Sequence, residues 1–164
     1  MNERDKSPKH VEYLADSAEL PLEMIKRLET AIGPSGNVVT WHKSFENNRN
    51  SDMADWYPTK ANFLNNIIDR TIDLEDIFKG GYVDIGFEGS TSIKKGLPVL
   101  VPSLSYAGMG IGSGTDAMDG WVKMLELKNG PERLKLQNEM LAYCKLDTLA
   151  MVRIFETIKT IGNL

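Results

Sequence analysis

The feature that most constrains the fold is the C-terminal segment 131–161, whose spacing predicts one long helix. Its apolar residues fall into two neighbouring stripes at steps of three and four residues. The first stripe contains Leu141, Cys144, Thr148, Met151, Phe155 and Ile158. The second contains Leu136, Met140, Tyr143, Asp147, Ala150 and Ile154. A helix with two such stripes buries one broad side, so this segment is expected in the core, either continuous or broken near Leu146.

A carboxylate interrupts the second apolar stripe. Asp147 follows Tyr143 by four residues, so the two side chains are neighbours on the helix surface. An unpaired carboxylate on a buried face is costly, and it requires a cation, hydrogen bonds or access to water. Two interpretations stay open. In the structural one, Asp147 pairs with a cation such as Lys145 or Arg153, or caps a helix at a break. In the functional one, Asp147 takes part in binding.

The remaining segments predict an α/β fold with an unusually small sheet. Two β-branched runs, 37–41 and 70–74, are the strand candidates, and glycine-rich residues 79–114 are expected to be largely loop. Helices are expected over 20–33, from Ser44 as N-cap to Pro58, over 59–69, and over 115–127. A short helix is expected near 92–95, capped by Ser90 or Ser92.

Composition excludes several classes of protein. The single cysteine, Cys144, excludes an internal disulfide framework, and it is expected in the core rather than as a nucleophile. No apolar run approaches the length of a membrane span, and the polar N-terminus is not a secretory signal, so a cytoplasmic protein without a membrane partner is predicted. The net charge of −4 argues against a surface that binds nucleic acid throughout, but it permits a carboxylate cluster that works with a divalent metal.

Two short motifs resemble those of the DnaQ-like 3′–5′ exonucleases in the RNase H-like superfamily. The segment "HKSFE", ending in Phe45 and Glu46, opens a predicted helix after a strand, and "YCKLD" places Tyr143 four residues before Asp147. The resemblance implies hydrolysis of phosphodiester bonds in DNA or RNA with Mg²⁺ or Mn²⁺. Asp147 and Glu46 would be metal ligands, and Tyr143 would orient the attacking water.

A more specific resemblance covers most of the chain from about His10 onward. The segments "WHKSFE", "RTIDL", "GSTSIKKGLPVL" and "YCKLDTLAMV" are similar to a bacterial domain of unknown function. That domain is found beside RecB- or Cas4-like nuclease modules, which implies such a module as a partner in the same protein. In the resemblance to the exonucleases, His42 takes the asparagine position of the second motif, where it would touch substrate or a water molecule near the metals; the alternative is an ordinary residue at a strand end.

Further substrate contacts are expected from Phe45, Lys94 and Lys95. The two lysines follow a serine-rich turn, where the backbone N–H groups at a helix N-terminus favour phosphate. The alternative for both lysines is an ordinary solvated helix face, and Phe45 belongs to the motif that contains Glu46.

The chain departs from the exonuclease pattern in its first motif. No early strand carries Asp-x-Glu, and the only such sequence, Asp73-Leu74-Glu75, follows Glu46 in the chain. We therefore expect Asp73 to end a strand or to cap the following helical turn. The missing motif predicts an incomplete RNase H-like fold, with a small mixed sheet, flanking helices and early strands absent from the chain. Residues 1–164 would form this domain or the C-terminal part of one, with 1–9 as a loose lead-in.

Two other functions stay open at this stage. One is a non-catalytic scaffold of the same fold that serves a neighbouring nuclease, which the glutamate at position 46 and the missing first motif favour. The other is a plain interaction domain, in which an exposed sheet edge promotes a homodimer. A response of the melting temperature to Mn²⁺ would separate a metal site from a scaffold.

Overall fold

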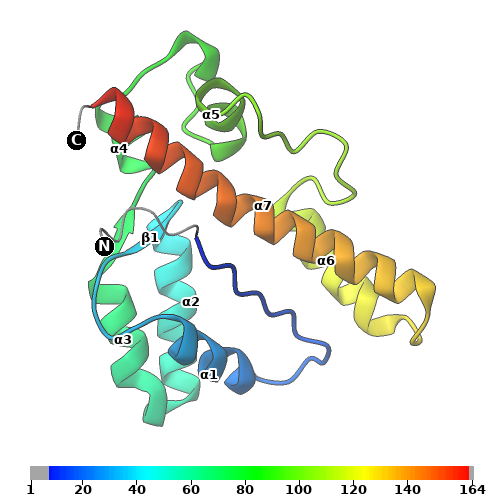
Figure 1. Cartoon of the computed structure of the whole chain (residues 1–164). Helices are drawn as coiled ribbons and strands as arrows, with labels where there is room; N and C mark the ends of the chain where they lie inside the picture. Colours follow the sequence, from blue (N-terminus) through cyan, green and yellow to red (C-terminus); the bar gives the residue numbers. More distant parts are fainter. Residues whose placement is uncertain (1–7, 163–164) are drawn as a thin grey trace.

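The computed structural model describes residues 8–162, which form a mixed α/β fold that is mostly helical. Its longest element is α7 (Pro131–Ile161), a continuous helix of 31 residues that runs across the whole molecule (Figure 1). Pro131 occupies the first helical position, where its missing N–H costs nothing. The prediction of one helix over 131–161 is confirmed, and there is no break near Leu146.

Three helices pack together on one side of α7. They are α1 (Leu22–Ala31), α2 (Lys43–Trp56) and α3 (Ala61–Asp69), with a single 3-10 turn at Pro58–Lys60 between the last two. Buried Ile25, Met53 and Leu64 form the core that joins them. Pro58 ends α2 as predicted. The predicted N-cap is wrong, however, because the N-cap position is His42 rather than Ser44.

The sheet has two parallel strands, β1 (Val38–Thr40) and β2 (Thr71–Asp73), with Val38 opposite Thr71. The connection between them runs through α2 and α3, as parallel strands require. The small sheet was predicted, but it is purely parallel rather than mixed. One face carries buried Thr71, and the other carries Val39 and Ile72, which are 39% and 46% exposed.

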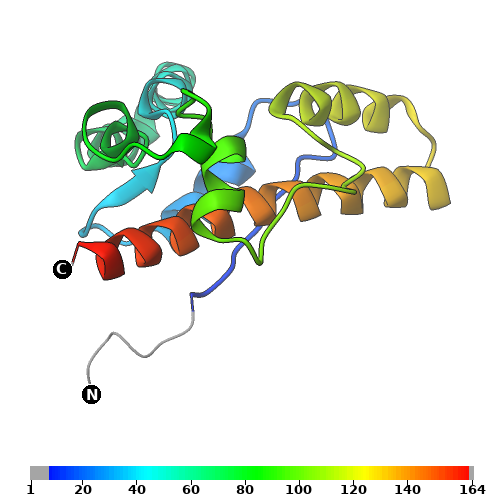
Figure 2. The same ribbon diagram turned by 90° about the horizontal axis from the view of Figure 1, so that it is seen from above.

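The second half of the chain lies along α7. After α4 (Asp76–Gly80) and a 3-10 turn at Ile85–Phe87 come α5 (Ile93–Leu100) and α6 (Gly114–Glu126). Figures 1 and 2 show α6 beside the N-terminal half of α7 and α5 beside its C-terminal half. Ser92 accepts a hydrogen bond from the backbone N–H of Lys94 and so caps α5, as one of the two predicted serines.

Two hydrophobic cores meet on α7, and the second predicted stripe builds both. Met140 and Tyr143 belong to a core with α6 and the preceding loop, whereas Ala150 and Ile154 belong to a core with Leu74, α4 and α5. The first predicted stripe is only partly in the core: Met151 and Ile158 pack against the α5 core, whereas Cys144, Thr148 and Phe155 are exposed. The burial predicted for Cys144 was therefore wrong.

The N-terminal segment that the structure describes, residues 8–21, has no regular secondary structure before α1. It is tied to the far end of the molecule, because Trp121 Nε1 donates a hydrogen bond to the carbonyl of Ala15 (2.8 Å) and Arg133 donates one to that of Asp16 (3.1 Å). Most of the predicted lead-in, residues 1–9, falls outside the described residues. Among residues 8–162, none of the helices is long and apolar enough to cross a membrane.

Candidate functional site

Asp147 lies where the two cores of α7 meet. It stands four residues after Tyr143, in one core, and three residues before Ala150, in the other. The hydroxyl of Tyr106, from the loop between α5 and α6, donates a hydrogen bond to Asp147 Oδ1 at 2.5 Å. The partner of Asp147 is therefore a tyrosine, while Arg153, which sequence analysis had offered, pairs with Glu156 instead (2.7 Å).

Tyr106, which binds this carboxylate, lies against Tyr143 and Lys94. The ring centroids of Tyr106 and Tyr143 lie 6.0 Å apart, and the Lys94 ammonium lies 5.7 Å from the centroid of each ring. Lys94 also donates a hydrogen bond to the carbonyl of Gly112. The structure thus brings together three residues that sequence analysis had proposed separately from two motifs, namely Lys94, Tyr143 and Asp147.

The two tyrosine hydroxyls stay protonated around neutral pH. Burial, followed by the hydrogen bond to Asp147 and its negative charge, raises the pKa of Tyr106 far above its usual range, and burial with the nearby charge of Asp147 raises the pKa of Tyr143. A neutral phenol can donate or accept a hydrogen bond, but it cannot serve as a general base. Tyr143 can therefore orient a water molecule, and Tyr106 can hold the carboxylate.

Glu46, the other predicted metal ligand, lies in the first turn of α2. Its residue surface is exposed, yet the surrounding protein desolvates the carboxyl group and raises its pKa. Carboxylate oxygens are the ligands that Mg²⁺ and Mn²⁺ prefer. Across residues 8–162, no group of three or more His, Cys, Asp or Glu side chains is gathered that could hold a metal ion. Asp147 and Glu46 therefore have the right chemistry but amount to only part of a ligand set.

Asp73 caps α2 from the neighbouring strand. As the last residue of β2, its carboxylate accepts hydrogen bonds from the backbone N–H groups of His42 (3.0 Å), Lys43 (2.9 Å) and Glu75 (3.1 Å). His42 adopts a left-handed backbone conformation, with φ of 68°, in this turn. The prediction that Asp73 ends a strand is confirmed, and its carboxylate caps both the following turn, through Glu75, and α2, which was not predicted.

Glu75 is held in a polar network although it is only 8% exposed. Its carboxylate accepts hydrogen bonds from Lys79 Nζ (2.8 Å) and Thr91 Oγ1 (2.7 Å), and the His42 Nδ1 atom lies 3.3 Å away. Lys79 Nζ also lies 3.7 Å from Asp73 Oδ2. A lysine ammonium thus occupies the place beside both carboxylates, and the Asp73–Glu75 pair stabilises the junction of β2, α2 and the loop before α5.

The other predicted substrate residues lie outside the Asp147 cluster. The imidazole of His42 joins the Glu75 network just described. Phe45 is 54% exposed on α2, with the Arg49 guanidinium 5.9 Å from its ring centroid. Lys95 forms an ion pair with Glu88. Of the four residues predicted to contact substrate, Lys94 alone lies beside Tyr143 and Asp147.

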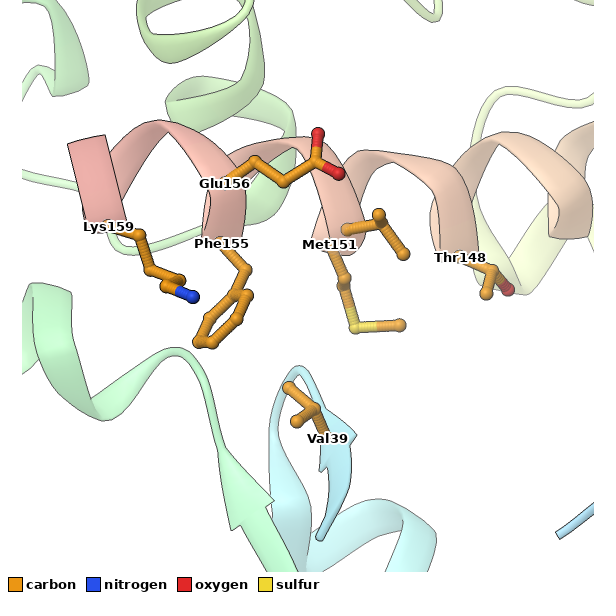
Figure 3. Close-up of a pocket in the computed structure, with 7 residues that line it drawn as sticks. Val39, Thr148, Met151, Phe155, Glu156 and Lys159 are labelled. Atoms are coloured by element: carbon orange, nitrogen blue, oxygen red, sulfur yellow. The ribbon is translucent and has the colours of Figure 1, made fainter. Parts of the chain in front are cut away.

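An apolar groove of about 430 Å³ separates β1 from α7. Figure 3 shows Met151 and Phe155 pointing from α7 toward Val39 on the exposed face of the sheet. The groove is lined by Val39, Thr148, Met151, Val152, Phe155, Glu156 and Lys159. Thr148, Met151 and Phe155 belong to the first predicted stripe, which runs beside the stripe that carries Asp147.

The fold and the site define a mainly helical α/β domain whose central helix carries one carboxylate between two cores. Residues 1–92 match the family described as Domain of unknown function (DUF2779). This match covers more than half of the chain, which therefore belongs to that family. No curated protein and no solved structure matches the chain. Glu46 lies within the matched residues, whereas Tyr143 and Asp147 follow them.

Sequence reasoning missed Tyr106. It lies 41 residues before Asp147 in the chain, inside a loop with no periodic pattern. The residues around it, "SLSYAGMG", indicate only a flexible connection. The one signal that could have pointed to it was the need of Asp147 for a hydrogen-bond donor.

Proposed function

We propose that this domain is a metal-dependent, exonuclease-like module of RNase H-like type that hydrolyses phosphodiester bonds in DNA or RNA. The observation that carries the proposal is the place of Asp147, a carboxylate kept on the buried face of α7 beside Tyr143. A half-buried position between core residues favours an apolar side chain unless the carboxylate has a task. The parallel pair β1 and β2, with α2 opening directly after β1, also supports the proposed fold.

Each candidate residue would have a separate role in the proposed reaction. Asp147 and Glu46 would hold divalent cations, which when bound supply positive charge for the oxygens of a phosphate. Tyr143 would orient the attacking water by hydrogen bonding, since its hydroxyl stays protonated. Lys94 would contact the phosphate backbone, because its ammonium lies beside both tyrosine rings. The other metal ligands would come from water, from the substrate or from the RecB- or Cas4-like partner module.

A non-catalytic scaffold of the same fold is the second candidate. Two observations favour it: residues 8–162 contain no group of three or more His, Cys, Asp or Glu side chains that could hold a metal ion, and Lys79 already neutralises Asp73 and Glu75. Such a scaffold would hold a nuclease module or nucleic acid without binding metal. The two functions therefore differ in an easily measured property, the change in melting temperature when Mn²⁺ is added.

We expect Mn²⁺ to raise the melting temperature of the full-length protein. At ten times the dissociation constant, a ligand of the folded state adds about 1.4 kcal/mol, which is about 3–6 °C for a domain of this size. Asp147→Asn should abolish the rise, whereas Asp119→Asn, at an exposed position on α6, should retain it. Differential scanning calorimetry with Mn²⁺ and with EDTA measures both. An unchanged melting temperature would favour the scaffold.

A further inference from the structure

We propose that a pocket between the N-terminal segment and α7 binds the phosphate backbone of a single-stranded nucleic acid. The pocket has a volume of about 380 Å³, and residues 8–10 form one wall and α7 the other. Figures 1 and 2 show this segment, in dark blue, beside the middle of α7. We call it the basic pocket, after four residues that line it together with Thr148 and Leu149, namely Lys9, His10, Lys145 and Arg153. The inference rests on the proposed function for the nature of the partner, and it adds a second contact surface for that partner.

The composition of the basic pocket differs from that of the whole chain. Four of its lining side chains are basic, and none of the lining residues that the structure describes is acidic. The chain as a whole has a net charge of −4. Residues 1–7, which lie outside the described part, contain two acidic and two basic residues, so they leave this local balance unchanged. A concave surface with a local excess of positive charge attracts anions.

Two of the four basic side chains are available for an anion. Within residues 8–162, the exposed Lys9 and Lys145 have no carboxylate at ion-pair distance. His10 and Arg153 each contact a glutamate just outside the pocket, at 2.8 and 2.7 Å. The Arg153 guanidinium uses only its Nη1 atom in that contact, so further N–H donors remain. The pocket therefore offers at least two unneutralised ammonium groups and a partly used guanidinium.

Charged and apolar side chains alternate along the α7 wall of the basic pocket. Lys145, Leu149 and Arg153 follow one another in steps of four residues, so they lie on one face of the helix, about 6 Å apart per step. Thr148 adjoins them and adds a hydroxyl that can donate to a phosphate oxygen. A single-stranded nucleic acid has a matching pattern, because charged phosphates alternate with flat bases that cover apolar surface. An acidic peptide would match the charges, but its carboxylates bring no apolar ring to cover Leu149.

The basic pocket is separate from the proposed reaction site. Lys145 and Leu149 are each two residues from Asp147, and two residues turn an α-helix by about 200°. These two side chains therefore lie on the opposite side of α7 from Asp147. The pocket would hold a part of the strand that is not being cleaved, so it contributes to affinity and not to the chemical step.

The experiment is a titration of a fluorescein-labelled oligothymidylate with the full-length protein in EDTA, followed by fluorescence anisotropy at several salt concentrations. The proteins are the wild type, the double variant Lys9→Gln/Lys145→Gln and the double variant Lys123→Gln/Lys128→Gln. The second double variant is the matched control, because it removes the same charge from exposed positions in α6 and just after it. Melting curves establish that both variants are folded, and fluorescein-labelled polyglutamate is the second probe.

We expect the pocket variant to lose both affinity and salt dependence. Each phosphate contact of a single strand contributes about 0.7 to the slope of log affinity against log salt concentration. Lys9→Gln/Lys145→Gln should therefore reduce this slope by about 1.4 and weaken binding about 25-fold at about 0.1 M salt. Lys123→Gln/Lys128→Gln should bind as the wild type does.

Three results would overturn the inference. Equal losses in the two double variants would mean that net charge, and not the basic pocket, governs binding. Wild-type protein that does not bind the oligothymidylate has no such surface, and tighter binding of polyglutamate would assign the pocket to an acidic polypeptide instead. Because affinity is measured in EDTA, intact binding without Mn²⁺-dependent hydrolysis would overturn the proposed function alone. Hydrolysis of a dinucleotide without binding of the longer strand would overturn this inference alone.

Discussion

Asp147→Asn should abolish Mn²⁺-dependent release of nucleotides from a labelled single strand by the full-length protein. The amide keeps the shape of the carboxylate and can still accept the hydrogen bond from Tyr106, but it lacks the negative charge that holds a divalent cation. The loss of one anionic metal ligand costs several kcal/mol of transition-state stabilisation. A cost of about 4 kcal/mol would lower the rate about 1000-fold.

The control for this variant is Asp119→Asn, which removes a charge from the exposed surface of α6. It should keep wild-type activity. Melting curves of both variants establish that the fold is intact before rates are compared. Equal rates for wild type and Asp147→Asn would refute the assignment of Asp147, and with it the proposed exonuclease function.

Asp73→Ala should destabilise the protein by about 3 kcal/mol, although Asp73 lies outside the proposed site. Its carboxylate accepts hydrogen bonds from three backbone N–H groups, two of which open α2. Loss of a helix cap costs about 0.5–2 kcal/mol, and a buried donor left unpaired adds about 1–3 kcal/mol. Urea denaturation followed by circular dichroism measures the difference, with Asp76→Ala, an exposed partner of Lys79, as the control.

The same network makes stability sensitive to acid. Burial alone would raise the pKa of Asp73 and Glu75, but hydrogen bonds from the backbone, from Lys79 and from Thr91 outweigh it and lower both values. A carboxyl group whose pKa is lower in the folded than in the unfolded protein stabilises the fold fully above about pH 4.5. This contribution is lost as the pH falls through the pKa of the folded state. Asp73→Ala should flatten this acid dependence. If the free energy of unfolding of Asp73→Ala falls with pH as steeply as that of wild type, the carboxylate contributes nothing to the acid dependence.

The elements that could be predicted from the sequence are those fixed by local patterns. The period of α7 defined its full length, Pro131 marked its start, and Pro58 marked the end of α2. Both strands were found from short β-branched runs. Local spacing is sufficient in these cases because helices and strands depend on neighbouring residues for their hydrogen bonds.

The parts that the sequence did not reveal depend on residues far apart in the chain. Cys144 was expected in the core, but whether a position on a stripe is covered depends on which elements pack against it, and here Cys144 stays exposed. Ser44 was expected to cap α2, but Asp73 does so from another strand. Tyr106 reaches Asp147 from a loop without any pattern. Each difference reflects a tertiary contact that outweighed a local preference.

The Mn²⁺ position in a crystal of the full-length protein tests the central claim most directly. Anomalous scattering from manganese locates the ion independently of activity. The account predicts a peak within coordination distance of a carboxylate oxygen of Asp147, with Glu46 on the same side. A manganese peak away from Asp147, or none in crystals grown with millimolar Mn²⁺, would contradict it.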